Sequence, residues 1–177
     1  MSRSIDFNKD DILKKAMDVF WSKGYESTSL KDLQEATGLL KGSLYNTFKS
    51  KENLFLLCLE KYGSYSQSFF YREGSDPKQY LSGFFKRLVD EGTNVENTKG
   101  CLIMNSCLEF AGQESSSSAK RSSLLLEAVE KNLENVIGNI DNYSKSEKKR
   151  LSTNLIVAAF SIREISKFKK AKDELYM

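Results

Sequence analysis

The stretch from Ser29 to Leu54, SLKDLQEATGLLKGSLYNTFKSKENL, decides the fold that we expect for this chain. Ser29 and Asp32 have the spacing of a capping box, so a short helix is expected to begin there and to end at Gly38. After a turn of a few residues, a second short helix is expected over about residues 41–48. Two short helices joined by a tight turn that contains glycine are typical of a helix-turn-helix arrangement.

Longer helices are expected on both sides of this pair. Residues 8–23 place apolar side chains at three- and four-residue spacing. Asp10 and Asp11 fall in the first turn of this helix, where acidic groups suit the helix dipole. A second long helix is expected to start at residues 50–52 and to run to about Phe70.

The composition agrees with a chain built of helices. The 177 residues contain a single proline, which favours long helices over a β-rich or linker-rich chain. We therefore predict an all-α fold with two domains. A three-helix helix-turn-helix domain would cover residues 5–50, and a larger helical domain would cover residues 51–177.

Several classes of protein are excluded by what the sequence lacks. Without histidine there is no Ser-His-Asp triad and no His-ligated metal, and no phosphate loop or paired-carboxylate motif is present. The longest apolar run, residues 54–59, is far shorter than the roughly 20 residues that a membrane span needs. Three scattered cysteines do not form a disulfide framework. We expect a soluble cytoplasmic protein that is not an enzyme and that needs no metal or cofactor.

The overall charge of +3 is modest for a protein that binds nucleic acid. By segment, the charge is +1 over residues 1–63, −3 over residues 64–143 and +5 over residues 144–177. The stretch between Thr28 and Lys51 holds four lysines against two acidic residues. A DNA-facing surface would therefore depend on this local balance.

Two stretches carry a resemblance to a known family. Residues 12–29, ILKKAMDVFWSKGYESTS, together with residues 30–54, are similar to the DNA-binding domain of TetR/AcrR-family transcriptional regulators. Residues 99–109, KGCLIMNSCLE, more weakly resemble a ligand-domain segment of one subgroup. The resemblance implies a DNA-binding domain, a C-terminal effector-binding and dimerisation domain, and an operator that is a palindrome.

The second short helix departs from the family in places that matter for base recognition. Leu40 stands where many members have Ser or Thr, and leucine cannot cap a helix. Asn46 and Thr47 follow the recognition tyrosine, where many members have His or Tyr. Leu44 and Phe48 are four residues apart and are expected to face inward. The operator sequence therefore cannot be carried over from the family.

An exposed short helix with small or polar side chains can enter the major groove of DNA. Ser43 and Asn46 are candidates for reading bases, whereas the resemblance implies phosphate contacts for Lys41 and Tyr45. The residues at the two other helix starts would offer backbone N–H groups to phosphates. The full predicted set is Thr28, Ser29, Lys41, Gly42, Ser43, Tyr45, Asn46 and Lys51. The alternative is that Tyr45 is a half-buried core residue and the lysines form an ordinary solvated face.

The second half of the chain is rich in aromatic residues at helical spacing. Helices are expected from Pro77, over residues 101–110, over residues 119–140 and over residues 144–168. Such a domain can hold an apolar or aromatic effector, although plain core packing explains the same pattern. The predicted ligand-binding residues are Tyr65, Phe69, Phe84, Leu88, Met104, Asn105, Leu108 and Phe160.

The segment around residues 99–109 holds two further candidates. Cys101 follows a lysine and a glycine near a helix start, which favours the thiolate, so it is a hypothetical redox or electrophile sensor. The alternative is a small packed residue. Asn105 and Glu109 share one helix face and either orient a ligand or satisfy backbone groups.

The last two expected helices carry more apolar surface than packing on one side requires. The apolar residues are Leu151, Leu155, Ile156, Ala158, Ala159, Ile162 and Ile165, and the resemblance implies that the two helices pair with a second copy of the chain. We therefore predict a homodimeric, ligand-responsive repressor whose partners are an operator in double-stranded DNA and a small-molecule effector. There are two alternatives. One is a redox-sensing variant of such a repressor, and the other is a helical interaction module without a DNA function. The effector and the operator sequence cannot be derived from the sequence.

Overall fold

The computed structural model describes residues 8–70, 76–93 and 99–168, with side chains to residue 66 in the first range. Each regular element in these ranges is a helix, which confirms the all-α fold class. None of these helices is both long and apolar enough to span a membrane. In chain order the helices are α1 (Lys9–Lys23), α2 (Leu30–Thr37), α3 (Lys41–Phe48), α4 (Lys51–Phe70), α5 (Pro77–Gly92), α6 (Leu102–Glu109), α7 (Ser117–Gly138) and α8 (Lys145–Ile165).

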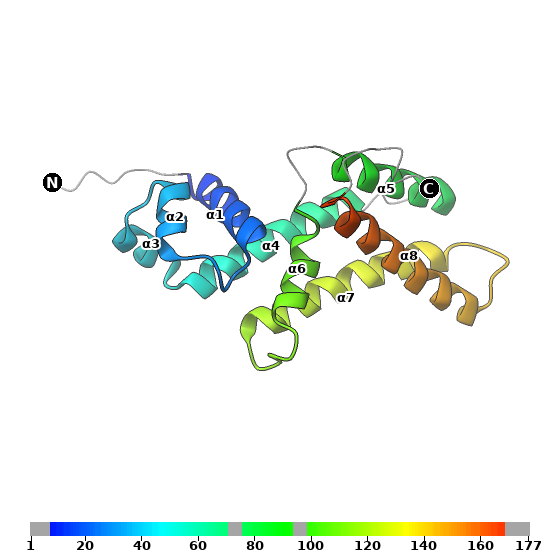
Figure 1. The fold of residues 1–177 in the computed structure, drawn as a ribbon. Coiled ribbons are helices and arrows are strands. Elements are labelled where there is room, and N and C mark those ends of the chain that lie inside the picture. The colour runs from blue at the N-terminus through cyan, green and yellow to red at the C-terminus, as the bar shows by residue number, and fades with distance from the viewer. Residues whose placement is uncertain (1–7, 71–75, 94–98, 169–177) are drawn as a thin grey trace.

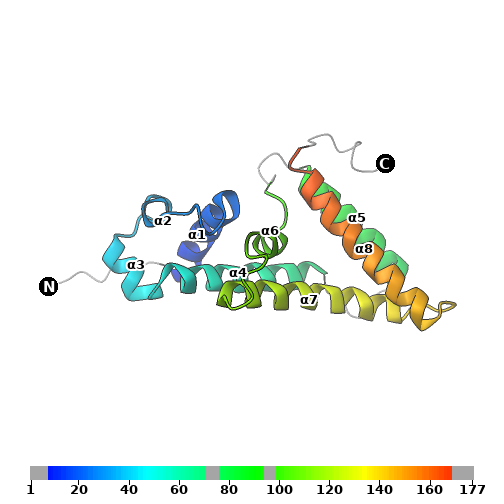
Figure 2. The ribbon, with the colours of Figure 1, turned by 60° about the horizontal axis from the view of Figure 1, so that its bottom comes forward.

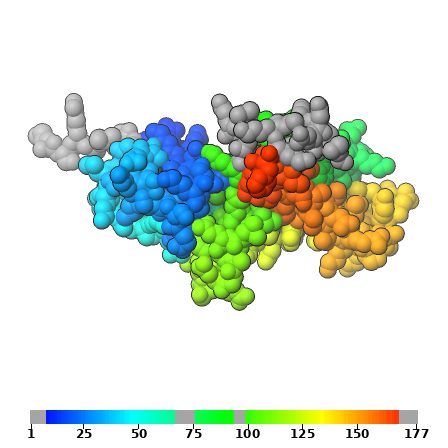
Figure 3. Space-filling view, in the orientation of Figure 1, coloured from blue at the N-terminus to red at the C-terminus, as the bar shows by residue number. Residues whose placement is uncertain are grey.

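Helix α4 connects the two halves of the molecule. Helices α1, α2 and α3 gather at its N-terminal end, and its other end reaches into the second half (Figure 1). Helix α7 lies alongside α4, and α5 and α8 lie side by side at the far end (Figure 2). Helix α6 stands between the N-terminal helices and the pair formed by α5 and α8, and the space-filling view shows its surface meeting that of α1 (Figure 3).

The helix ends follow the local signals in the sequence. The Ser29 hydroxyl accepts a hydrogen bond from the Asp32 N–H at 3.1 Å, and the Asp32 carboxylate accepts one from the Ser29 N–H at 2.8 Å. This capping box confirms the predicted start of α2. Gly38 ends the helix with a φ of 73°, which suits a residue without a Cβ atom. Pro77 occupies the first turn of α5, as expected.

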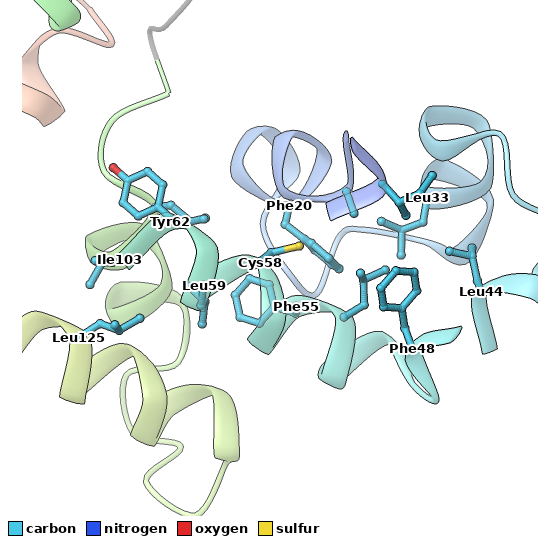
Figure 4. Close-up of a cluster of buried hydrophobic side chains, with 14 of the residues drawn as sticks. Phe20, Leu33, Leu44, Phe48, Phe55, Cys58, Leu59, Tyr62, Ile103 and Leu125 are labelled. Atoms are coloured by element: carbon cyan, nitrogen blue, oxygen red, sulfur yellow. The ribbon is translucent and has the colours of Figure 1, made fainter. Parts of the chain in front are cut away.

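The larger apolar core crosses the boundary predicted between residues 50 and 51. Figure 4 shows buried side chains from α1, α2, α3 and α4 in one continuous cluster with side chains from α6 and α7. The members that come from beyond α4 are Leu102, Ile103, Phe110 and Leu125. The N-terminal helices therefore share their core with the second half of the chain.

A second core holds α8 against α5 and α7. It contains Ile156 and Ala159, which are each 8% exposed, so these two members of the apolar set pack inside the protomer. The helical period turns a different stripe of α8 to solvent. The large apolar residues exposed there are Val157, Ile165 and, just beyond the helix, Phe168.

Candidate functional site

The outer face of α3 carries most of the residues predicted to contact DNA. Lys41, Gly42 and Asn46 are exposed, and Tyr45 is 40% exposed rather than part of the core. Ser43 is half-buried. Leu44 and Phe48 on the opposite side are 4% and 1% exposed, so the predicted inward-facing pair is confirmed. These two side chains hold the helix on its neighbours and leave its polar face in solvent.

The N-terminus of α3 lacks a side-chain cap. Leu40 occupies the capping position and makes no side-chain hydrogen bond to the helix, as its chemistry predicts. The first N–H groups of α3 are therefore available to an anion such as a phosphate. Leu40 is itself 76% exposed, and an apolar side chain at this place suits contact with a thymine methyl group.

Thr28 and Lys51 have structural partners instead of facing outward. The Thr28 side chain is buried, and its hydroxyl donates to the Gly24 carbonyl at 2.5 Å. The Lys51 ammonium donates to the Thr28 carbonyl at 2.8 Å and lies 4.3 Å from the centre of the Tyr25 ring. Both side chains therefore fix the turn between α1 and α2, and the phosphate contacts expected at these helix starts stay a prediction.

Ser29 is exposed, but its hydroxyl is engaged in the capping box with Asp32. The Lys23 ammonium, 2.5 Å from the Asp32 carboxylate, and the hydrogen bonds from Ser29 hold the pKa of Asp32 well below its usual range. Asp32 is therefore ionised at neutral pH and accepts these bonds fully. The charge of Lys23 is compensated here and does not add to the positive field of the α3 face.

A strained turn joins α3 to α4. Lys49 has a φ of 69° and a ψ of −47°, and the Ser50 N–H donates to the Phe48 carbonyl at 2.8 Å. These values describe a γ-turn of the rare kind, which a residue with a Cβ atom adopts at a cost. The Lys49 ammonium donates back to the Asn46 carbonyl at 2.9 Å, so its charge stays beside α3.

Replacing Lys49 with glycine is expected to raise the free energy of unfolding by about 1 kcal/mol, because glycine adopts a positive φ without steric conflict. Urea unfolding of the purified protein measures this change. Lys49→Ala is the matched control, because it removes the same charge and keeps the Cβ atom. An equal gain in both variants would show that charge, and not backbone strain, is responsible.

The second half of the chain holds a small cavity between α4, α5, α7 and α8. Tyr65, Phe84, Leu88 and Phe160, four of the residues predicted to bind a ligand, line this cavity. Its volume is about 40 Å³, so a ligand must displace part of the lining to enter. Among the residues that the structure describes, no group of His, Cys, Asp or Glu could hold a metal ion.

Three predicted ligand-binding residues lie elsewhere, and a fourth is outside the described side chains. Asn105 and Leu108 line a separate groove between α1 and α6, and Met104 does not line the cavity. The Asn105 amide donates to the Lys99 carbonyl and accepts from the Lys167 ammonium, each at 2.9 Å. Helix α6 turns Ile103 toward the cavity, and its period places Asn105 on another side. The side chain of Phe69 is not among those described.

Glu109 joins α6 to the helix-turn-helix unit. Its carboxylate accepts hydrogen bonds from the N–H groups of Tyr25 at 2.9 Å and Glu26 at 2.8 Å, in the turn before α2. A Cβ atom on Gly24 would lie 3.0 Å from the same carboxylate, so the glycine permits this close approach. Of the two roles considered for Glu109, the structure shows that it satisfies backbone groups.

The two cysteines near α6 differ in their surroundings. Cys101 is half-buried and lines the cavity, beside the Tyr62 and Arg163 side chains. Burial and the neighbouring Cys101 raise the pKa of Cys107 to about 11, so its thiolate is disfavoured at neutral pH. The sensor role of Cys101 stays a prediction.

Comparison with known proteins places this geometry in a family. The model of the family described as "Bacterial regulatory proteins, tetR family" matches residues 12–58, which include α2, α3 and the first part of α4. The repressor ComR of Escherichia coli (strain K12) is 35% identical over 105 residues, which are 57% of this chain and 50% of ComR. The uncharacterised regulator YezE of Bacillus subtilis (strain 168) is 32% identical over 112 residues, 62% of this chain and 58% of YezE. The match spans about half the length of these curated relatives.

Solved structures extend the similarity over almost the whole chain. One of them is a cysteine mutant of CifR, a TetR-family transcriptional regulator, in complex with 26-base-pair operator DNA. It has a TM-score of 0.77 and 27% identity, and the match covers 98% of this chain and 94% of that chain. Residues 12–58 therefore match the TetR family in sequence, and the fold of the chain is similar to that of TetR-family regulators. A TetR regulator from Chloroflexus aurantiacus has a TM-score of 0.80 at 18% identity, covers 94% of this chain and 87% of that chain, and supports the fold alone.

Four residues described above were not in the predicted list of site residues. For Leu40 the sequence held a usable signal, because an apolar residue at a capping position cannot bond to the helix and so indicates an uncapped helix start. For Lys49 and Arg163 the sequence held no such signal. The strained backbone of Lys49 and the burial of Arg163 both depend on tertiary packing. Glu109 was placed on the right helix face, but its partners lie more than 80 residues away in the chain.

Proposed function

We propose that this protein is a TetR-family transcriptional repressor that binds a palindromic operator in double-stranded DNA as a homodimer in the cytoplasm. A small apolar or aromatic effector in the cavity of the second half releases the DNA. The observation that carries the proposal is the outer face of α3, where Lys41, Tyr45 and Asn46 are exposed above buried Leu44 and Phe48. That face matches a recognition helix in size and chemistry.

The comparisons support the same conclusion for relatives of the chain. ComR is named a transcriptional repressor, and the CifR structure contains operator DNA. In this chain, Tyr45 and Lys41 would contact phosphates, and Asn46 would read a base edge. The uncapped start of α3 would add backbone N–H groups to one phosphate, with Leu40 beside it.

A dimer would use the exposed apolar stripe of α8. Val157 is 58% exposed and Ile165 is 43% exposed, and an apolar stripe of this kind on a surface helix suits burial against a second copy. Two copies would present two α3 helices, and a palindromic site with half-sites about one DNA turn apart would accommodate both.

The route from effector to DNA would pass through α6. Ile103 on this helix lines the cavity, and Glu109 at its end holds the turn before α2. A ligand that enlarges a cavity of about 40 Å³ must shift its walls, and a shift of α6 would change the orientation of the helix-turn-helix unit. Ligand and operator would then oppose each other's binding.

Selection of bound sequences from random duplex DNA tests the function directly. The expected result is a palindrome whose affinity falls steeply as salt rises. A selected site without symmetry would contradict the dimer. Binding that is absent at low salt would contradict the function and would favour a helical interaction module.

Variants of α3 test which residues read the site. Asn46→Ala is expected to cost about 1–3 kcal/mol on the selected site and to relax preference at one base position. Tyr45→Ala is expected to weaken binding to all sequences alike, because phosphate contacts carry no base information. Fluorescence anisotropy with labelled duplexes measures both. Asn135→Ala and Tyr143→Ala, at exposed positions outside α3, are the matched controls and should leave DNA binding unchanged.

A further inference from the structure

The cavity of the second half combines apolar walls with one buried ion pair. Phe84, Leu133 and Phe160 form part of its apolar lining. The charged residues of the lining are Arg163 from α8 and Glu91 from the last turn of α5. An Arg163 Nη donates to the Glu91 carboxylate at 2.9 Å, and the other Nη donates to the Gly100 carbonyl at 2.8 Å.

The two partners of this ion pair differ in how easily they can leave it. The Arg163 side chain is 7% exposed, and its bond to the backbone of Gly100 fixes it in place. Burial alone would lower the pKa of Arg163, but Tyr62, Cys101 and Glu91 raise it on balance, so the guanidinium stays cationic. The Glu91 side chain is 24% exposed and is also held by the Tyr65 hydroxyl at 3.1 Å. Tyr65 is itself 56% exposed, so this side of the cavity can open to solvent.

This asymmetry restricts the ligands that the cavity can accept. The free volume of about 40 Å³ forces a ligand to displace part of the lining, and Glu91 is the polar group that can move into water. Without Glu91, the Arg163 guanidinium would be a buried and unpaired charge, which is strongly unfavourable. An occupant that replaces Glu91 must therefore supply a negative charge of its own, and a planar carboxylate matches the guanidinium.

The geometry points to an apolar molecule with one carboxylate group as the ligand of this cavity. Its carboxylate takes the place of Glu91 on Arg163, and its apolar body lies against Phe84, Leu133 and Phe160. Binding breaks the ion pair between α5 and α8 and leaves their apolar contacts in place. The inference rests on the proposed function only in naming this cavity as the effector site.

Removal of Glu91 tests the exchange of carboxylates without requiring the natural ligand. Glu91→Ala leaves Arg163 unpaired and opens a space the size of the lost side chain, so the protein should unfold at a lower temperature. Thermal unfolding is followed without DNA, at constant ionic strength, with propionate, propanol or propylammonium. We expect propionate to restore most of the lost unfolding temperature and to bind at least tenfold more tightly than the other two.

The matched control is Glu60→Ala, which removes a carboxylate from an ion pair with Arg121 on the surface. Propionate should stabilise this variant no more than chloride does. Equal rescue of both variants, or equal effects of propionate and propanol on Glu91→Ala, would overturn the proposal.

A second arm covers the case in which Glu91→Ala does not fold. The wild-type protein is then titrated with 3-phenylpropanoate and with 3-phenylpropanol. Stronger stabilisation by the acid supports the proposal, whereas equal stabilisation, or none by either, overturns it. Because neither arm contains DNA, a failure to bind an operator would leave these results unaffected, and a failure here would leave the DNA-binding function standing.

Discussion

Replacing Phe55 with alanine is expected to lower the free energy of unfolding by about 3–5 kcal/mol, and to destabilise both halves of the chain together. Phe55 is 1% exposed, and its ring centre lies 5.0 Å from those of Phe20 and Tyr25 and 5.8 Å from that of Phe110. It therefore touches α1, the turn before α2 and the end of α6 at once. Truncation to alanine would therefore leave a cavity among these three elements.

Urea unfolding followed by two signals measures this effect. Trp21 is the single tryptophan of the chain and reports on α1, whereas far-ultraviolet circular dichroism reports on all the helices. The two transitions should coincide and should shift to lower urea together in Phe55→Ala. Leu124→Ala, at a position that is 54% exposed, is the control and should change stability little. Two separate transitions would contradict a shared core.

Replacing Glu109 with alanine is expected to cost about 1.5–3 kcal/mol of stability, because it removes a charged acceptor from two backbone N–H groups. The turn before α2 would lose its attachment to α6, so the helix-turn-helix unit would no longer be held in one orientation. Binding to the selected operator should weaken as a result, because a loosely held recognition helix must be ordered on the DNA at an entropic cost.

Hydrogen exchange at the amides of Tyr25 and Glu26 gives the direct readout for Glu109→Ala. Both amides should exchange faster in the variant, since each loses its acceptor. Glu109→Gln should lie between wild type and Glu109→Ala, because its amide keeps one acceptor oxygen. Glu114→Ala, in the exposed loop before α7, is the control. Unchanged exchange in Glu109→Ala would rule out the proposed attachment.

Local rules in the sequence predicted much of the N-terminal structure. The capping box at Ser29, the glycine at residue 38 and the inward pair Leu44 and Phe48 depend on neighbours within one or two helical turns, and all are present. The failure of Leu40 to cap α3 follows from its chemistry in the same way. These features can be predicted because few residues determine each of them.

Contacts between distant parts of the chain could not be predicted. The Lys51 ammonium binds the carbonyl of Thr28, which nothing in the local sequence indicates. Asn105 holds Lys99 and Lys167 and does not line the cavity. Arg163 carries a charge on a helix and so resembles a surface residue, yet packing of α5 against α8 buries it. Periodicity gives the face of a helix but does not identify the element that covers that face.

The continuous core around α4 limits how this protein can be recombined with others. A chimera joined at residue 50 would take α1, α2 and α3 away from Leu54, Phe55 and Leu59, which are 2%, 1% and 0% exposed. The grafted part would then present an apolar surface to water and would need a foreign α4 of matching shape. Exchange of DNA-recognition properties is therefore best made by changing the outer side chains of α3, while the scaffold from α1 to α7 is inherited as one piece.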